Sequence, residues 1–158
     1  MIRSSTILAL VATLAAWTGS AAAQSRIQAG VLECRGLGST GFIIGSVQEF
    51  ECVFRSDLGI LARYRGMVRK LGVDLGFTEQ SFLAWGVFAP VREIGPGDLA
   101  GNYGGVSASA AIGIGAGANA LVGGSNNSIA LQPLSVEGQT GLNLALGIAA
   151  FELRYAGP

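Results

Sequence analysis

The stretch from Gly105 to Gly124, GVSASAAIGIGAGANALVGG, constrains the fold more than any other part of the chain. Taken at every second residue, its part from Gly105 to Asn119 separates into two sets. One holds glycine, serine and asparagine with a single alanine, and the other holds valine, isoleucine and alanine. This period of two is typical of a β-strand. A helix would have to contain six glycines, each destabilising it by about 1 kcal/mol relative to alanine. The stretch therefore predicts β-structure with one face almost free of side chains, which another backbone layer or a ligand can approach closely.

The segment 139–155 repeats this alternation, with leucines and small residues on opposite faces as far as Ala150. Beyond Ala150 the apolar residues, Phe151 and Leu153 among them, occupy the other set of alternating positions. Such a change of phase requires a β-bulge or a bend. We expect the small-residue faces of the two segments to meet or to line one surface. The residues of this expected packing or hydrophobic-ligand surface are Gly113, Gly115, Gly117, Leu142, Leu144 and Leu146.

Residues 1–23 have the features of a secretory signal peptide. Arg3 supplies the positive start, an apolar core runs from Ile7 to Trp17, and three alanines ending at Ala23 form the cleavage site. The core is shorter than the roughly 20 residues that a membrane span needs, so cleavage is favoured over a retained anchor. We expect a mature chain of residues 24–158 that folds as a single β domain and is periplasmic or secreted.

Two cysteines, Cys34 and Cys52, lie 18 positions apart. Pairs of this kind in exported proteins usually form a disulfide. A redox or metal-binding pair is the alternative, but the chain has no C-x-x-C spacing and no histidine. The spacing therefore predicts a disulfide that staples a ribbon of two strands near the N-terminus.

The charged residues are distributed unevenly along the chain. The expected mature chain, which lacks Arg3, has nine basic and ten acidic residues and a net charge of about −1. This charge gives no reason to expect nucleic-acid binding. From Leu99 to Phe151 the only acidic or basic residue is Glu137. The first half is thus typical of a soluble protein, and the second half is apolar and glycine-rich.

A basic cluster lies within the predicted strand 63–76. One interpretation is a contact with an anionic surface such as lipid head groups. The other, which we favour, is the solvated face of an outer strand that is kept charged to discourage edge pairing. The cluster consists of Arg63, Arg65, Arg69 and Lys70.

Further strands are predicted where apolar residues alternate or run together between turn residues. They span 26–34, 50–54, 82–90 and 129–134. Glycines between 36 and 41 predict a turn after the first of these strands, and Trp85 is expected to anchor the core. Residues 96–103, PGDLAGNY, are predicted to form a turn or a single helical turn, and they are the only place in the mature chain where we expect helix. The sequence therefore predicts an all-β, antiparallel sandwich or barrel.

Most catalytic arrangements are absent from the sequence. Without histidine the usual general base and the usual zinc ligand are missing, and a disulfide leaves no free thiol. No spacing of carboxylates identifies an acid and base pair. The glycines from Gly113 to Gly117 lie inside a predicted strand, not between a strand and a helix as in a dinucleotide-binding loop. We predict neither an enzyme nor a bound cofactor or metal.

Four segments of the chain form a distinctive set, namely VLECRGLGSTGFIIGSVQEFECVF, RYRGMVRKLGVDLGF, LAWGVFAP and GANALVGGSNNSIALQPLSVEGQTGLNLALGIAAFELR. They resemble the exported alphaproteobacterial family known as domain of unknown function 992. The resemblance covers nearly all of the mature chain and implies an envelope location. A second, weaker similarity links the C-terminal small-residue strands and the T-G-L-N-L segment to SYLF-type lipid-binding domains, and it implies lipid binding only by analogy.

The leading hypothesis is a non-enzymatic periplasmic β protein whose apolar second half binds a hydrophobic partner, either membrane lipid or an envelope protein. The alternative is a structural module that self-associates into a homo-oligomer through the edges of its glycine-faced strands. A small enzyme or an enzyme inhibitor is a third class, which we favour least.

Overall fold

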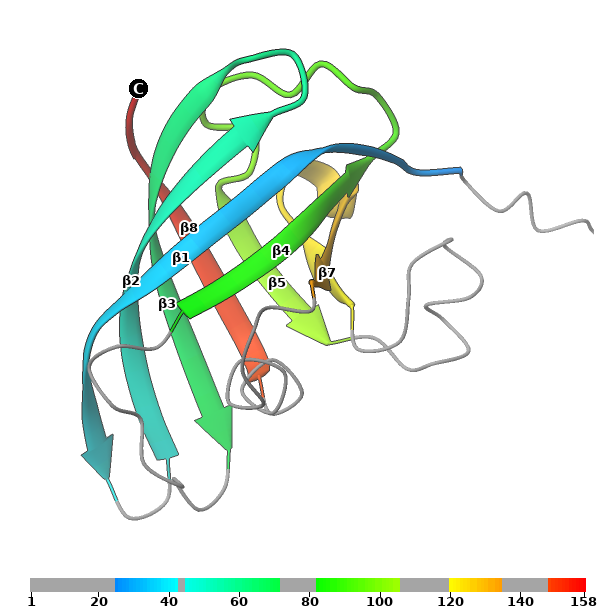
Figure 1. The fold of residues 1–158 in the computed structure, drawn as a ribbon. Coiled ribbons are helices and arrows are strands. Elements are labelled where there is room, and N and C mark those ends of the chain that lie inside the picture. Colours follow the sequence, from blue (N-terminus) through cyan, green and yellow to red (C-terminus); the bar gives the residue numbers. More distant parts are fainter. Residues whose placement is uncertain (1–24, 43–44, 72–81, 106–119, 135–147) are drawn as a thin grey trace, which may run out of the picture.

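The computed structural model describes residues 25–42, 45–71, 82–105, 120–134 and 148–158. Within these residues eight strands form a closed antiparallel barrel in the order β1-β2-β3-β8-β5-β6-β7-β4, with β4 pairing back onto β1 (Figure 1). The strands are β1 (Ile27–Phe42), β2 (Gly45–Ser56), β3 (Leu61–Leu71), β4 (Phe82–Ala89), β5 (Gly101–Gly105), β6 (Leu121–Gly123), β7 (Ile129–Pro133) and β8 (Ile148–Gly157). The predicted all-β class is confirmed, and of the two architectures considered the barrel is the one that forms.

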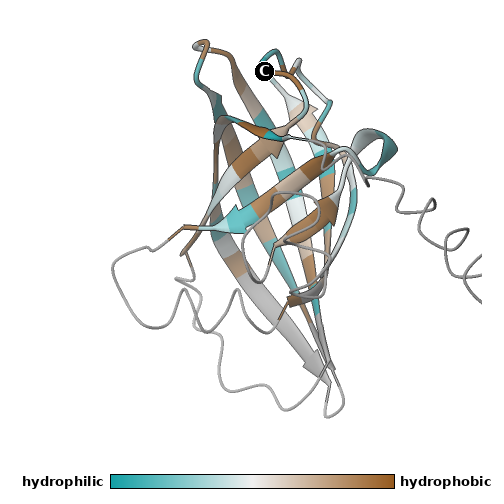
Figure 2. Cartoon of the chain, turned by 90° about the vertical axis from the view of Figure 1, so that its right-hand side faces the viewer, coloured by the Kyte–Doolittle hydropathy of each residue, from teal (hydrophilic) through white to brown (hydrophobic). Residues whose placement is uncertain are grey.

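The described interior of the barrel is filled by side chains from alternate strand positions. Figure 2 shows the resulting alternation of apolar and polar residues along the strands. The aromatic side chains among the largest fully buried groups are Trp85, Tyr64, Tyr103, Phe50, Phe54 and Phe151. Trp85 on β4 stacks on Phe151 on β8, with ring centroids 6.0 Å apart, although the two strands are not neighbours. Trp85 is therefore the core anchor that its sequence context predicted.

The disulfide between Cys34 and Cys52 is confirmed. The two residues are register partners on β1 and β2, their Cα atoms are 4.0 Å apart, and both side chains face the core. The turn predicted at 36–41 is wrong, because β1 continues to Phe42. A register shift between Gly36 and Gly38 marks a β-bulge there, so these glycines bend a strand and do not end it.

The phase change predicted near Ala150 is confirmed as an irregularity in β8. Arg69 of β3 pairs with Ala150, whereas the next β3 residue pairs with Ile148, so β8 carries one extra residue. Ile148 and Phe151 are consequently both buried although they are three positions apart. The bulge allows both apolar sets to reach the same interior.

The basic cluster does not lie on an edge strand, which corrects the interpretation that we favoured from the sequence. β3 pairs with β2 on one side and with β8 on the other. Its charges therefore cannot serve to block edge pairing. Arg63, Arg65 and Arg69 are outward-facing residues of a strand inside the sheet.

A segment of residues 90–100 covers one end of the barrel. Its Leu99 is fully buried, and Gly97 N–H donates a hydrogen bond of 2.9 Å to the Tyr64 hydroxyl. Residues 96–99 form turns and β5 begins at Gly101, so of the two alternatives predicted for 96–103 the turn forms and the helical turn does not. Within the described ranges the single helical turn is a 3-10 turn at Ser125–Asn127.

The glycine-rich stretch is described only at its two ends. β5 ends at Gly105 and β6 begins at Leu121. Residues 106–119 and 135–147 lie outside the described ranges, and so does the surface expected from their small-residue faces. Its members were Gly113, Gly115, Gly117, Leu142, Leu144 and Leu146. The strand predicted at 129–134 forms as β7, and Pro133 is its last residue.

Candidate functional site

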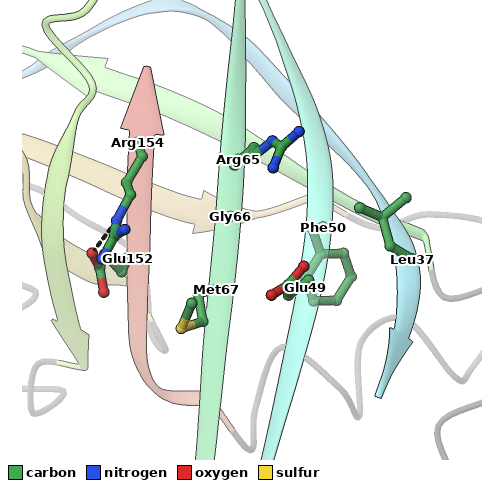
Figure 3. A pocket seen from close by; sticks show the side chains of 8 residues that line it. All are labelled: Leu37, Glu49, Phe50, Arg65, Gly66, Met67, Glu152 and Arg154. Carbon is green, nitrogen blue, oxygen red and sulfur yellow. Dashed lines mark hydrogen bonds and ion pairs between the residues drawn. The ribbon is translucent and has the colours of Figure 1, made fainter. Parts of the chain in front are cut away.

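A groove on the outer wall of the barrel is a concave site formed by described residues. It crosses β1, β2, β3 and β8 and has a volume of about 140 Å³ (Figure 3). We call it the charged groove. Its lining residues are Leu37, Glu49, Phe50, Arg65, Gly66, Met67, Glu152 and Arg154.

Strand register arranges the charges of this groove in two rows. Arg65 on β3 is the register partner of Arg154 on β8. Two residues further along β3, Met67 lies between its partners Glu49 on β2 and Glu152 on β8. The two rows are therefore about 7 Å apart, because each strand residue advances by roughly 3.4 Å. The residues that line the groove are therefore arginines at one end and glutamates around a methionine at the other, and Glu51, the β2 partner of Arg65, lies beside the arginine end without lining the groove.

Only half of these charges are paired within the protein. Arg154 Nε lies 2.7 Å from Glu152 Oε1, and this ion pair is drawn in Figure 3. Within the described part of the chain, neither Arg65 nor Glu49 makes an ion pair or a side-chain hydrogen bond. Both side chains are exposed. The groove thus presents one unpaired cation and one unpaired anion.

The floor of the groove depends on the absence of a side chain at Gly66. A Cβ atom at this inward-facing position would lie 2.7 Å from Phe151 Cε2 and 3.1 Å from Cys52 Sγ. Glycine therefore allows the β3 backbone to lie directly over the packed core. Beside it, the half-buried Met67 and the exposed Leu37 supply apolar contact area.

The basic cluster predicted from sequence is only partly brought into this site. Arg63, Arg65 and Arg69 are exposed on the outer face of β3, and Lys70 belongs to the same strand. Of the four, only Arg65 lines the groove. Carboxylates alternate with these arginines on the neighbouring strands, so the wall carries mixed charge. These carboxylates are Glu49, Glu51 and Glu152.

Sequence reasoning missed most of the groove, including Glu49, Met67 and the pair on β8. Charged residues at every second position were visible at 49–51, 63–65 and 152–154, and this spacing indicated that they face outward. Alternation alone does not say which strands are neighbours. β3 and β8 are separated by about half of the chain and meet only in the closed barrel.

Two buried tyrosines hold the end segment and have no acid–base role near neutral pH. The Tyr103 hydroxyl donates a hydrogen bond of 2.7 Å to the Leu99 carbonyl, and burial raises the pKa of Tyr103 well above its ordinary value. Burial also raises the pKa of Tyr64, against the opposing effect of its backbone hydrogen bonds to Gly97 and Leu99. Both phenols stay protonated in the working range of most proteins.

The core also contains polar atoms without hydrogen-bond partners, namely the Gln48 side-chain amide and Trp85 Nε1. Gln48 is 1% exposed and Trp85 is 0% exposed, so neither borders an open space. Among the described residues, no cluster of three His, Cys, Asp or Glu is placed to hold a metal ion. Within the same ranges, no helix has the length and apolarity needed to cross a bilayer.

The fold and the groove define a small, disulfide-stapled β-barrel with a packed described core and a charged groove on its outer wall. The family model described as protein of unknown function (DUF992) matches residues 13–154, so the chain belongs to this family. The family resemblance seen in the sequence is thus confirmed, and no enzymatic family is indicated. No curated protein and no solved structure matched the chain. The similarity to SYLF-type domains is not supported by these comparisons.

Proposed function

We propose that this protein is a non-enzymatic, exported envelope protein that binds another protein through the charged groove. The observation that carries the proposal is the unpaired charges of Arg65 and Glu49 on either side of the groove, beside the apolar surface of Met67. Charged side chains that have no partner within the protein and lie beside an apolar surface can form ion pairs with a binding partner. Their arrangement favours partners with the complementary pattern.

Two other binding modes have less support. An anionic lipid surface would meet Glu49, Glu51 and Glu152 along with the arginines, so attraction and repulsion would largely offset each other. A hydrophobic ligand inside the described part of the barrel would have to displace packed side chains, because Trp85 and Phe54 are 0% exposed. The mixed charge of the outer wall therefore favours a protein partner over lipid.

Self-association through glycine-faced strands receives no specific support from the described contacts. The relevant segments lie mostly outside the described ranges. Each of the eight described strands already has a hydrogen-bonded neighbour on both sides along at least part of its length. This leaves the charged groove as the better-supported contact.

Export is part of the proposal and rests on the signal-like residues 1–23 together with the disulfide. Disulfides persist mainly in oxidising compartments. We expect protein from a periplasmic fraction to begin at Gln24, as shown by its intact mass. Without reductant, neither Cys34 nor Cys52 should react with an alkylating reagent. Retention of residues 1–23, or two reactive thiols, would contradict export through an oxidising envelope.

Site-specific photo-crosslinking tests the groove as a binding surface. A photoreactive residue at Met67 should give a discrete protein adduct in envelope extracts, and this adduct should disappear when Arg65→Glu is added. The matched control is the same photoreactive residue at Gln28, which is exposed on β1 far along the strand from Leu37. Adducts of equal yield at both positions, or an adduct that survives Arg65→Glu, would refute the proposal.

A lipid partner would give a different result from a protein partner. Co-sedimentation with vesicles would then rise with anionic lipid content, fall with salt, and be lost in the Arg65→Glu variant. That outcome, without a discrete protein adduct at Met67, would replace the proposed protein partner with a membrane surface.

A further inference from the structure

We propose that the charged groove recognises an extended polypeptide segment that carries an acidic and a basic side chain two residues apart. The inference rests on the proposed function and specifies the partner of the same site. It follows from the register of β2, β3 and β8, which places the arginines and the glutamates of the groove in two separate rows.

The spacing of the two rows matches the repeat of an extended chain. Of the residues that line the groove, Arg65 and Arg154 form one row, with Glu51 on β2 beside Arg65 but outside the lining, and Glu49 and Glu152 form the other row two residues along the strands. In an extended chain, residues i and i+2 point to the same face at a separation of about 7 Å. A segment aligned with β3 would therefore place its acidic residue against Arg65 and its basic residue against Glu49 at the same time.

The size and the lining of the groove set the extent of the contact. A volume of about 140 Å³ accommodates one or two side chains and not a folded surface. Met67 and Leu37 offer apolar area to the aliphatic stem of a lysine or glutamate, and a methionine side chain adapts readily to different shapes. A partner with a single charge would leave either Arg65 or Glu49 unpaired, so the groove favours a segment that carries both signs.

The interaction should be weak and sensitive to salt. Arg65 and Glu49 are exposed, and exposed ion pairs contribute little to binding because water and salt screen them. We expect a dissociation constant on the order of 1 mM for an isolated peptide. A whole partner protein would add further contacts around the groove.

The test uses three capped five-residue peptides and the disulfide-intact mature protein, with binding followed by amide NMR shifts. The first peptide has glutamate at its second position, lysine at its fourth and threonine elsewhere. The second has the same composition with the two charged residues adjacent, which places them on opposite faces of an extended chain. The third has glutamate at both its second and fourth positions. We expect the first peptide to shift amides around Met67 and to bind more tightly than the other two.

Variants of the groove charges provide the second comparison. Arg65→Gln and Glu49→Gln should each weaken the first peptide about two- to fivefold, the range expected when one exposed ion pair is removed. Arg63→Gln is the matched control, because Arg63 is exposed on the same face of β3 but does not line the groove. Glu49→Lys should reverse the preference, so that the peptide with two glutamates binds more tightly than the first.

The outcomes separate this inference from the proposed function. Equal binding of the first two peptides, equal effects of Arg63→Gln and Arg65→Gln, or no shift near Met67 at peptide concentrations of about 10 mM would overturn the inference. If the photo-crosslinked adduct at Met67 still depends on Arg65, the proposed function stands and only the recognition pattern is wrong. Loss of that dependence would refute the proposed function itself.

Discussion

Gly66→Ala should destabilise the barrel, although it adds a single methyl group. The new Cβ would lie 2.7 Å from Phe151 Cε2, 3.1 Å from Phe151 Cζ and 3.1 Å from Cys52 Sγ. To restore a contact of about 3.5 Å, the edge of the phenyl ring would have to move by roughly 0.8 Å. The ring is 1% exposed, and it is held between Trp85, at 6.0 Å, and Tyr103, at 6.4 Å between centroids. The ring therefore has no free space into which to move.

The expected magnitude follows from two opposing effects. Overpacking a well-filled core costs about 1–3 kcal/mol. Replacing glycine by alanine also restricts the unfolded chain, which stabilises the folded state by about 0.4–1 kcal/mol. The second effect is shared by any glycine whose backbone conformation suits alanine. Gly104→Ala isolates it, because Gly104 lies in β5, a Cβ there would meet no atom within 4 Å, and neither Gly66 nor Gly104 has a positive φ.

The assay is urea unfolding followed by the fluorescence of Trp85, the only tryptophan of the expected mature chain. Gly104→Ala should be as stable as the parent protein or slightly more stable. Gly66→Ala should be less stable than Gly104→Ala by about 1–3 kcal/mol, since the unfolded-state effect cancels in the comparison. Equal stabilities of the two variants would show that the space behind Gly66 is not filled, and would refute the account of the groove floor.

Three further predictions concern the disulfide and the buried tyrosines. Replacing Cys34 and Cys52 together by alanine should lower the free energy of unfolding by about 3 kcal/mol in urea titrations, as expected when a disulfide that closes a loop of 18 residues is lost. An unchanged urea midpoint would contradict the predicted destabilisation. Tyr103→Phe should lower the free energy of unfolding by about 1–3 kcal/mol in the same assay, because the buried Leu99 carbonyl loses its hydrogen-bond donor. An unchanged free energy of unfolding would mean that another donor replaces the tyrosine hydroxyl. Thermal stability should stay constant from about pH 7 to 9, since the chain has no histidine, and should fall above about pH 10. Burial raises the pKa of Tyr103 and Tyr64 in the folded state above the ordinary value of 10.0, so the unfolded state loses these protons first and the folded state becomes less stable as pH rises. A melting temperature that rises with pH above about pH 10 would contradict this direction.

Local sequence signals determined much of the fold. The alternation of apolar and polar residues predicted several of the strands, because the strand period sorts side chains to two faces wherever the strand lies. The nearly continuous apolar run at 82–90 predicted the strand of Trp85 and its buried position. The change of phase near Ala150 predicted the bulge in β8, since residues of both phases had to reach one core. The spacing of Cys34 and Cys52 predicted their disulfide, because a hairpin of two strands brings such residues face to face.

Only the tertiary structure decided which strands are neighbours, and the candidate site depends on that choice. Glycines at 36–41 suggested a turn, but pairing with β2 continues through them as a bulge, because the partner strand supplies hydrogen bonds that no local pattern encodes. In the closed barrel β8 pairs with β3, so the basic cluster lies on a strand with neighbours on both sides and not on the edge strand that the sequence suggested. This pairing also brought Glu152 and Arg154 next to Arg65 and Met67, across more than eighty residues of sequence. The charged groove is a product of this long-range register, and strand alternation within any one segment cannot specify it.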